Sequence, residues 1–284
     1  MADQRNDKNA DFRLIEEFGD EWQRYNFLDG KSNQDLDRQF KAYTSILDFN
    51  LFKNDDTLVV DMGAGSGRWT ERLLPYFSNI VAIEPSNKAV EILKKRFRGD
   101  SRVKIEQATV KHNSIIDNSA DLIISLGVLH HLPNTQEALV DCFRKIKPGG
   151  YLLCYLYYNL ENKSAIYRTI FYLSNFLRTI ISKLPKRIKM LLCYLIALNI
   201  YWPMAKISKV AAKFGIDNSN LPLHHYAHFP FVFLKNDALD RFGTRIENRF
   251  GKVEIEYMLQ QAQFNTGTLK FSELEPFYTF LIQK

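Results

Sequence analysis

The sequence predicts an α/β fold, a doubly wound domain with a mainly parallel sheet that carries a helical insertion, and three observations support this prediction. Short apolar runs alternate with helical patterns from residue 57 to about residue 158. These runs are nearly continuous in apolar residues, which is typical of strands that helices cover on both faces. Residues 160–214 then contain two or three long apolar helices with no strand between them.

The expected strands follow one another along the chain. They are TLVVDM, NIVAIEPS, RVKIEQA, ADLIISLGV and GYLLCYLYY before the insertion, and NTGTLKFSE and PFYTFLIQK after it. Helical patterns at 87–97 and 135–146 lie between strands, and KVEIEYMLQQAQF predicts another helix after the insertion. KPGG at 147–150 ends one helix and turns the chain into the next strand.

A helical lead-in precedes the sheet. Phe18, Trp22 and Tyr25 repeat at helical spacing, and residues 34–50 continue as helix. This aromatic stripe fits two roles. We favour packing of the helix onto the core. The alternative is a lid over a bound cofactor, which would bring Trp22 to the ligand. The predicted division of the chain is a lead-in over 1–55, a core over 56–157, a helical insertion with a loop over 158–236, and a return to the core over 237–284.

Positive charge is concentrated in the insertion. The formal net charge is +6, and residues 161–215 hold ten Lys or Arg residues against one acid, so the rest of the chain is about −3. The N-terminal residues lack the apolar core of a secretory signal, and we therefore expect a cytoplasmic protein. Cys142, Cys154 and Cys193 are widely spaced, which favours buried thiols over disulfides or a zinc site.

A glycine-rich turn follows the first expected strand, in VVDMGAGSGRWT at 59–70. A dinucleotide site has the spacing G-x-G-x-x-G, which places the pyrophosphate on a helix N-terminus. Here the glycines are Gly63, Gly65 and Gly67, and Arg68 stands where the third glycine would be. Asp61 at the strand end would repel a pyrophosphate but attract an ammonium or sulfonium group. We therefore expect a positively charged ligand.

A second acid, Glu84, ends the next expected strand, 23 residues after Asp61. An acid at this place accepts hydrogen bonds from ribose hydroxyls. A ribose and a cationic group without a pyrophosphate describe S-adenosylmethionine, whose demethylated product is S-adenosylhomocysteine. The segments VVDMGAGSG, VAIEPS, ADLIISLGVLHHLP and KIKPGGYLL resemble the motifs of class I S-adenosylmethionine-dependent methyltransferases, over roughly residues 57–156 and the tail after 237.

The resemblance implies a Rossmann-like sheet of seven strands, the last antiparallel, with the cofactor across the carboxyl ends of the first two. It implies that Asp61 and the turn glycines lie near the methionine part and Glu84 on the ribose. The backbone of Ser125 and Leu126 would lie near the sulfonium.

One departure from the family concerns adenine. Many relatives carry an acid after the third strand that meets the adenine amino group, whereas this chain has Gln107, Ala108 and Thr109 there. Either Thr109 or a backbone carbonyl replaces the acid, or adenine is held more loosely.

Methyl transfer to a hydroxyl needs a base as well as alignment of the acceptor with the bond from sulfur to methyl. His130 and His131 follow the fourth expected strand, where the methyl group would point, and a neutral imidazole has a suitable pKa. The alternative is that one of them caps or underlies the following helix.

A loop at 221–229 offers further catalytic candidates. His225 and Tyr226, with His224 and His228 nearby, would fold over the acceptor. We expect no metal here, because adjacent residues do not both face one ion easily and no carboxylate or Cys accompanies them. Tyr157 and Tyr158 after the fifth strand fit either the pocket or the core.

The insertion fits two roles. Residues 190–205 are strongly apolar but shorter than the roughly 20 residues of a spanning helix. Lysines and an arginine flank this stretch on both sides. We favour a helical cap buried on the core over the alternative, a peripheral membrane contact through 183–213.

The sequence therefore predicts methyl transfer to a small-molecule or glycan acceptor, with O-methylation favoured. YLYYN, YWPMA and DALDRFGT resemble bacterial methyltransferases of secondary metabolism or surface polysaccharide pathways. Two alternatives stay open. VLHHLP and KPGG also resemble wobble-uridine tRNA methyltransferases, although the apolar stretches of the insertion make nucleic acid the less favoured partner. The other is a protein that binds the cofactor without catalysis.

Overall fold

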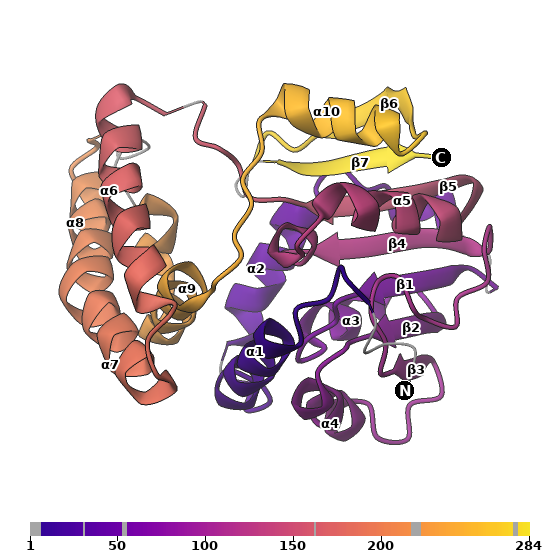
Figure 1. The fold of residues 1–284 in the computed structure, drawn as a ribbon, viewed down its shortest axis with the longest axis horizontal. Coiled ribbons are helices and arrows are strands. Elements are labelled where there is room, and N and C mark those ends of the chain that lie inside the picture. The colour runs from indigo at the N-terminus through magenta and orange to yellow at the C-terminus, as the bar shows by residue number, and fades with distance from the viewer. Residues whose placement is uncertain (1–6, 31, 53–55, 162, 217–222, 275–277) are drawn as a thin grey trace. The chain divides into compact units, whose positions relative to one another are not determined.

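The computed structural model divides the chain into two compact units (Figure 1). The first comprises Met1–Asn159 and Ile246–Lys284, and the second comprises Leu160–Arg245. The structure describes residues 7–30, 32–52, 56–161, 163–216, 223–274 and 278–284.

The first unit is built on a seven-stranded sheet with the strand order β3-β2-β1-β4-β5-β7-β6. The strands are β1 Leu58–Met62, β2 Asn79–Ile83, β3 Val103–Glu106, β4 Ala120–Leu126, β5 Ile146–Tyr155, β6 Asn265–Phe271 and β7 Thr279–Gln283. Neighbours from β3 to β5 pair in parallel, and β7 is antiparallel to β5 and β6. The predicted doubly wound fold, with its antiparallel last strand, is confirmed.

Helices cover this sheet, and its core consists mainly of apolar residues. The helical elements are α1 Phe12–Arg24, α2 Asn33–Tyr43, η2 Phe49–Phe52, α3 Arg68–Leu73, α4 Asn87–Arg96, η3 Leu129–His131, α5 Thr135–Lys145 and α10 Lys252–Gln261. Strand residues such as Val60, Ile123 and Leu152 are fully buried, because both faces of the sheet are covered. The strand order reverses between β1 and β4, and ligands of such folds bind at the carboxyl ends of the strands beside this point.

The lead-in is less continuous than predicted. The helix expected over 34–50 ends at Tyr43, and Phe49–Phe52 forms a separate 3-10 turn. The hydroxyl of Thr44 donates back to the carbonyl of Phe40 at 2.8 Å. Such back-bonding by Thr competes with continuation of the helix.

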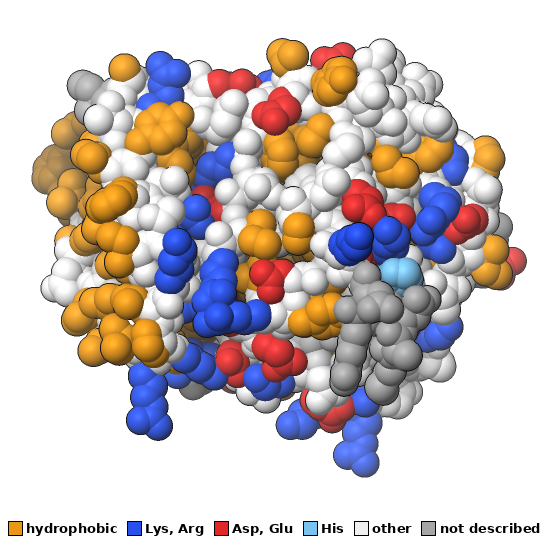
Figure 2. Space-filling view, viewed as in Figure 1, with side chains coloured by type: hydrophobic (Ala, Val, Ile, Leu, Met, Phe, Trp, Pro, Cys, Tyr) orange, Lys and Arg blue, Asp and Glu red, His pale blue; other side chains and the backbone are white. Residues whose placement is uncertain are grey.

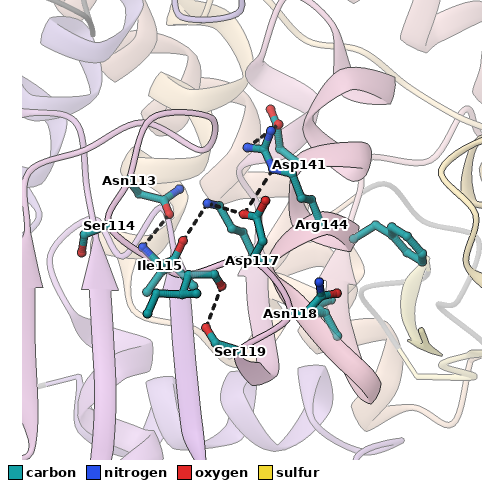
Figure 3. A network of polar contacts seen from close by, with 12 residues as sticks. Asn113, Ser114, Ile115, Asp117, Asn118, Ser119, Asp141 and Arg144 are labelled. Atoms are coloured by element: carbon teal, nitrogen blue, oxygen red, sulfur yellow. Dashed lines mark hydrogen bonds and ion pairs between the residues drawn. The ribbon is translucent and has the colours of Figure 1, made fainter.

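A polar network fixes the opposite end of the sheet (Figure 3). The Lys145 ammonium donates to the Ile115 carbonyl at 2.6 Å and to the Asp117 carboxylate at 2.8 Å. Arg144 forms ion pairs with Asp117 and Asp141 at 3.5 and 3.2 Å. These residues precede β4 and β5, so the network ties the loop before β4 to the end of α5 and lies away from the carboxyl ends. Its function is structural.

The second unit is helical. Its elements are α6 Ala165–Ile181, α7 Lys186–Ile196, η4 Ala197–Tyr201, α8 Trp202–Lys213, η5 His224–His228 and α9 Phe231–Gly243. Together α7, η4 and α8 form one helix over Lys186–Lys213, which we call the long helix. Among the described residues this helix alone is long and apolar enough to cross a membrane, which by itself is a weak indication.

The predicted end of the insertion at residue 236 is wrong. That position falls inside α9, whose Leu234, Ala238 and Phe242 pack against Cys193 and Tyr201 in the core of the second unit. The helix therefore belongs to the insertion, and the return to the sheet begins at Ile246.

Candidate functional site

The turn after β1 makes close backbone approaches that require glycine. Gly63 and Gly65 have φ angles of 84° and 57°, in the region that side chains disfavour. A Cβ at Gly63 would lie 2.5 Å from a methyl carbon of Val128, and one at Gly65 would lie 2.8 Å from the Trp22 ring. Gly67, with φ of 79°, then begins α3. The predicted turn glycines thus hold the backbone open at the carboxyl end of β1.

Asp61 is buried at this end of β1, with 2% of its surface exposed. Its Oδ2 accepts a hydrogen bond from the Thr70 hydroxyl at 2.5 Å. Burial raises the pKa of Asp61 to about 6, against the opposing effects of hydrogen bonds from Thr70 and the charge of Arg68. The carboxylate is therefore held in a place where its negative charge is poorly compensated.

Glu84 directly follows β2 and binds the glycine turn. Its Oε2 accepts from the backbone N–H of Gly65 at 2.9 Å, and its Oε1 accepts from that of Ser86 at 2.8 Å. Burial raises the pKa of Glu84 to about 7, against these two hydrogen bonds, and the charge of Asp61 raises it further. The two predicted acids therefore share one electrostatic site.

This donor set fits S-adenosylmethionine. The buried carboxylates of Asp61 and Glu84 repel each other. A sulfonium or ammonium cation would stabilise both charges, whereas a pyrophosphate would destabilise them. Each oxygen of Glu84 has a further lone pair beyond the backbone hydrogen bond, so it can accept from a ribose hydroxyl. The residues present thus suit a cationic nucleoside.

The end of β4, with Ser125 and Leu126, lies beside this turn. The Ser125 hydroxyl donates to the Met62 carbonyl at 3.2 Å, and both β4 residues are buried. Val128, which follows, is the residue that a side chain at Gly63 would meet. The position of the sulfonium at this backbone stays a prediction.

Trp22 lies on the glycine turn from the N-terminal side. Its ring stands against Gly65, and the Arg68 guanidinium lies 4.8 Å from the Trp22 ring centre and 4.6 Å from that of Trp69. Phe18, from the same helix, lies with its ring centre 5.0 Å from that of His131. The stripe packs on the site residues themselves, so packing and a lid are compatible roles for α1.

A residue that sequence reasoning missed, Asp7, lies at the end of β3. The Thr109 hydroxyl donates to Asp7 Oδ2 at 2.8 Å, and the Asn9 backbone N–H donates to Asp7 Oδ1 at 2.9 Å. Asn9 in turn exchanges two hydrogen bonds with the backbone of Asn134, at 2.9 and 2.7 Å. The N-terminal segment thus brings a buried carboxylate to the place where the chain lacks an acid after β3.

We predict that Asp7→Ala weakens S-adenosylmethionine binding by roughly fivefold, the worth of one hydrogen bond of about 1 kcal/mol to the adenine amino group. Titration calorimetry checks this. Asp11→Ala, which removes the cap of α1 on Arg13 and Leu14, is the control. An equal loss in both variants would show that Asp7 only anchors the segment.

His131 is held in one tautomer. Its Nδ1 lies 2.8 Å from the carbonyl oxygen of Ile246. Because a carbonyl only accepts, Nδ1 carries the proton, and Nε2 is the basic nitrogen of the neutral ring. His131 is 5% exposed. The arrangement suits a general base, with the backbone orienting the ring.

His130 is a weaker candidate. It is fully buried, and its ring nitrogens make no hydrogen bond of normal geometry, although the Tyr155 backbone lies close enough to favour the charged form slightly. Burial and the charges of His131 and Arg249 lower its pKa well below 6.5. Its ring stacks on Tyr157 with centres 3.8 Å apart. Because its pKa is so low, His130 is better suited to positioning its neighbours than to acting as a general base.

Aromatic rings surround these histidines at the carboxyl ends of β4 and β5. Tyr155 lies 5.4 Å from Tyr43 and 5.7 Å from Tyr157 between ring centres. Arg249 lies over the Tyr157 ring at 4.9 Å. Tyr158 instead pairs with Phe250 as an isolated β-bridge. Of the two predicted tyrosines, Tyr157 therefore belongs to the histidine cluster.

The remaining catalytic candidates belong to the second unit. The Tyr226 hydroxyl donates to Asp237 of α9 at 2.5 Å, so this side chain is held by its own unit. The side chain of His225 lies outside the described residues. Within the described part of the chain, no group of three or more His, Cys, Asp or Glu residues is placed to hold a metal.

Part of the chain is similar to known methyltransferases. Residues 60–154 match the family model described as methyltransferase domain. An uncharacterized methyltransferase of Schizosaccharomyces pombe is 31% identical over 113 residues, 39% of this chain and 42% of that protein. The ubiquinone biosynthesis O-methyltransferase of Agrobacterium fabrum is 27% identical over 94 residues, 32% and 37% of the two chains.

A solved S-adenosylmethionine-dependent methyltransferase from Aquifex aeolicus matches over 89% of this chain and 92% of that one, at 13% identity and a TM-score of 0.48. The chain spans 42%, 42% and 38% of the length of three curated relatives that it matches. The sheet topology and the family match over residues 60–154 identify that part of the chain as a methyltransferase domain with the fold of class I S-adenosylmethionine-dependent methyltransferases. S-adenosylmethionine is the cofactor of that class.

Proposed function

We propose that the protein transfers a methyl group from S-adenosylmethionine to a hydroxyl of a small-molecule or glycan acceptor. The observation that carries methyl transfer is the pair of buried carboxylates, Asp61 and Glu84, whose charges interact and of which Glu84 accepts a hydrogen bond from the Gly65 backbone. The tautomer of His131 favours a hydroxyl as the acceptor group. A hydroxyl must lose a proton during methylation, and an oriented imidazole can take it.

The bound cofactor would supply a methyl group already activated by the positive sulfur. Asp61 would stabilise the positive charge, and Glu84 would accept hydrogen bonds from the ribose. Nε2 of His131 would take the acceptor's proton as the methyl group passes from sulfur to oxygen. The carbonyl of Ile246 would then stabilise the resulting imidazolium through its hydrogen bond with Nδ1.

The rings of Tyr155 and Tyr157 favour an acceptor with a flat or apolar face. Sugars and aromatic rings both offer such a face to tyrosine, and the buried cluster would help to exclude water. The relatives include an O-methyltransferase and a phosphoethanolamine N-methyltransferase, so their names do not separate the acceptor atoms. His131 is the feature that favours oxygen.

Calorimetric titration with S-adenosylmethionine and S-adenosylhomocysteine tests the proposal. The wild-type protein should bind both, and Asp61→Ala should weaken S-adenosylmethionine binding at least tenfold, or about 1.4 kcal/mol. Asp100→Ala is the matched control, since that carboxylate pairs with Arg102 on the surface. Near-wild-type affinity in a folded Asp61→Ala protein would remove Asp61 from the cofactor site.

A further inference from the structure

We propose that the second unit docks on an anionic membrane surface through exposed apolar faces of α6 and of the long helix. Most of the large hydrophobic side chains that the described residues expose belong to this unit. Figure 2 shows hydrophobic side chains gathered over α6, α7 and α8. This inference goes beyond methyl transfer and does not depend on it.

The first apolar face lies on α6. Its exposed side chains recur at helical spacing, and they are Ile170, Tyr172, Leu173, Phe176, Leu177 and Ile180. Leu173 and Phe176 are 67% and 66% exposed. A helix that packed this face inside its own domain would bury it, and an exposed stripe of this kind marks an interaction site.

The long helix has two distinct faces. Its buried positions recur every three or four residues and pack on the unit's core, and they are Lys189, Cys193, Ala197, Tyr201, Ala205 and Ser208. Leu191, Leu195, Leu198 and Trp202 are exposed elsewhere on the same helix. An apolar surface therefore remains after the helix has made its contacts within the protein.

The charged residues along α6 and the long helix have one sign. No acid occurs between Glu161 and Asp217, whereas ten Lys or Arg residues lie there. Lys183, Lys186 and Arg187 are exposed where the long helix begins, and Lys206 and Lys213 are exposed near its end. Basic residues beside an apolar helical face suit anionic headgroups above acyl chains.

Other occupants fit less well. A second copy would bring two sets of positive charges together without intervening acids, which is repulsive. Nucleic acid would meet the lysines but leave Leu, Ile and Phe side chains in water. A spanning arrangement of the long helix would separate its buried stripe from α9, which carries Asp237, Asp240 and Arg241. A membrane surface satisfies both the charge and the apolar faces.

Co-sedimentation with vesicles tests the proposal, using phosphatidylcholine alone or mixed with phosphatidylglycerol and no cofactor. We expect at least tenfold tighter binding to the anionic vesicles, partly weakened by salt, and release by alkaline carbonate. Leu173→Asp with Leu191→Asp should reduce binding at least tenfold. Val253→Asp with Tyr257→Asp is the matched control, because these exposed residues lie on α10 of the first unit.

A second pair of variants tests the charge without touching the apolar faces. Lys206→Glu with Lys213→Glu should weaken binding to anionic vesicles, whereas Lys94→Glu with Lys95→Glu on α4 should not. Equal binding to both vesicle types, or no binding, would overturn the proposal. Retention on the vesicles after carbonate would indicate a spanning helix. A dimer that dissociates in the variant with Leu173→Asp and Leu191→Asp would indicate an interface between copies of the chain. Cofactor titration of the same preparations reports separately on the methyltransferase site.

Discussion

Replacing His131 with alanine is expected to lower kcat roughly 100-fold, while affinity for S-adenosylmethionine stays within about twofold. A positioned general base contributes about 10²- to 10⁴-fold to such reactions. Nδ1 of His131 is committed to the Ile246 carbonyl at 2.8 Å, so Nε2 is the nitrogen that accepts the proton. Because Asp61 and Glu84 are untouched, the cofactor should still bind.

Single-turnover transfer of labelled methyl groups to a hydroxyl acceptor measures this effect, with cofactor affinity measured on the same samples. His112→Ala is the matched control, since this partly buried histidine lies in the loop after β3. His131→Gln separates orientation from basicity, because an amide can keep a hydrogen bond to Ile246 but cannot take the proton. Unchanged turnover in folded His131→Ala would leave the base elsewhere or show that none is needed.

The arrangement of glycines and acids at the carboxyl ends of β1 and β2 was predictable because its signals are local. A buried strand, a carboxylate at its end and glycines at positive φ occupy one short stretch, and each has a physical reason to stand there. Glu84 follows from the same logic one strand later. The structure adds a feature that spacing does not reveal, the hydrogen bond from Gly65 to Glu84 that joins the two motifs.

The positions of site residues that depend on contacts between distant parts of the sequence were not predictable. Asp7 reaches β3 because Asn9 and Asn134 pair, and nothing in the spacing of the N-terminal segment indicates such a partner. The orientation of His131 depends on a backbone carbonyl, which any residue at position 246 would offer. The start of α9 did have a local signal, because Pro230 precedes the first turn of a helix, a favoured place for proline.

The role of the insertion was ambiguous for a different reason. Apolar residues recur on more than one face of the long helix, so periodicity alone does not distinguish a buried cap from a surface that binds lipid. The exposure of each position gives further information, and it depends on how α6, α9 and the long helix pack. That packing places the stripe at Cys193, Ala197 and Tyr201 inside and leaves Leu191 and Leu195 outside.

The affinity for S-adenosylmethionine is also expected to fall roughly 100-fold between pH 7.5 and pH 5.5. A cationic ligand binds the ionised forms of Asp61 and Glu84, whose pKa values are raised to about 6 and about 7. At pH 5.5 the protonation of Glu84 would cost roughly 30-fold and that of Asp61 roughly fourfold, since each unit below a pKa is worth tenfold. At pH 7.5 both are largely ionised.

The stability of the protein without cofactor should change in the opposite direction. Both folded-state pKa values lie above their ordinary values near 4. The folded state therefore binds more protons than the unfolded state over this range, and the contribution of these groups to the free energy of unfolding falls as pH rises from about 4 to about 7. Added cofactor should raise Tm strongly at pH 7.5 and weakly at pH 5.5.

Calorimetry over this pH range, in buffers of different ionisation enthalpy, measures both affinity and proton exchange. About one proton in total should be released on binding at pH 6.5, where Glu84 is mostly protonated and Asp61 mostly ionised. Glu84→Gln should bind more weakly and retain only the roughly fourfold dependence that Asp61 contributes. If the affinity did not change between pH 7.5 and pH 5.5, the positive charge of the ligand would not interact with Asp61 and Glu84. Protons and a cationic ligand must compete when both bind the same ionised carboxylates.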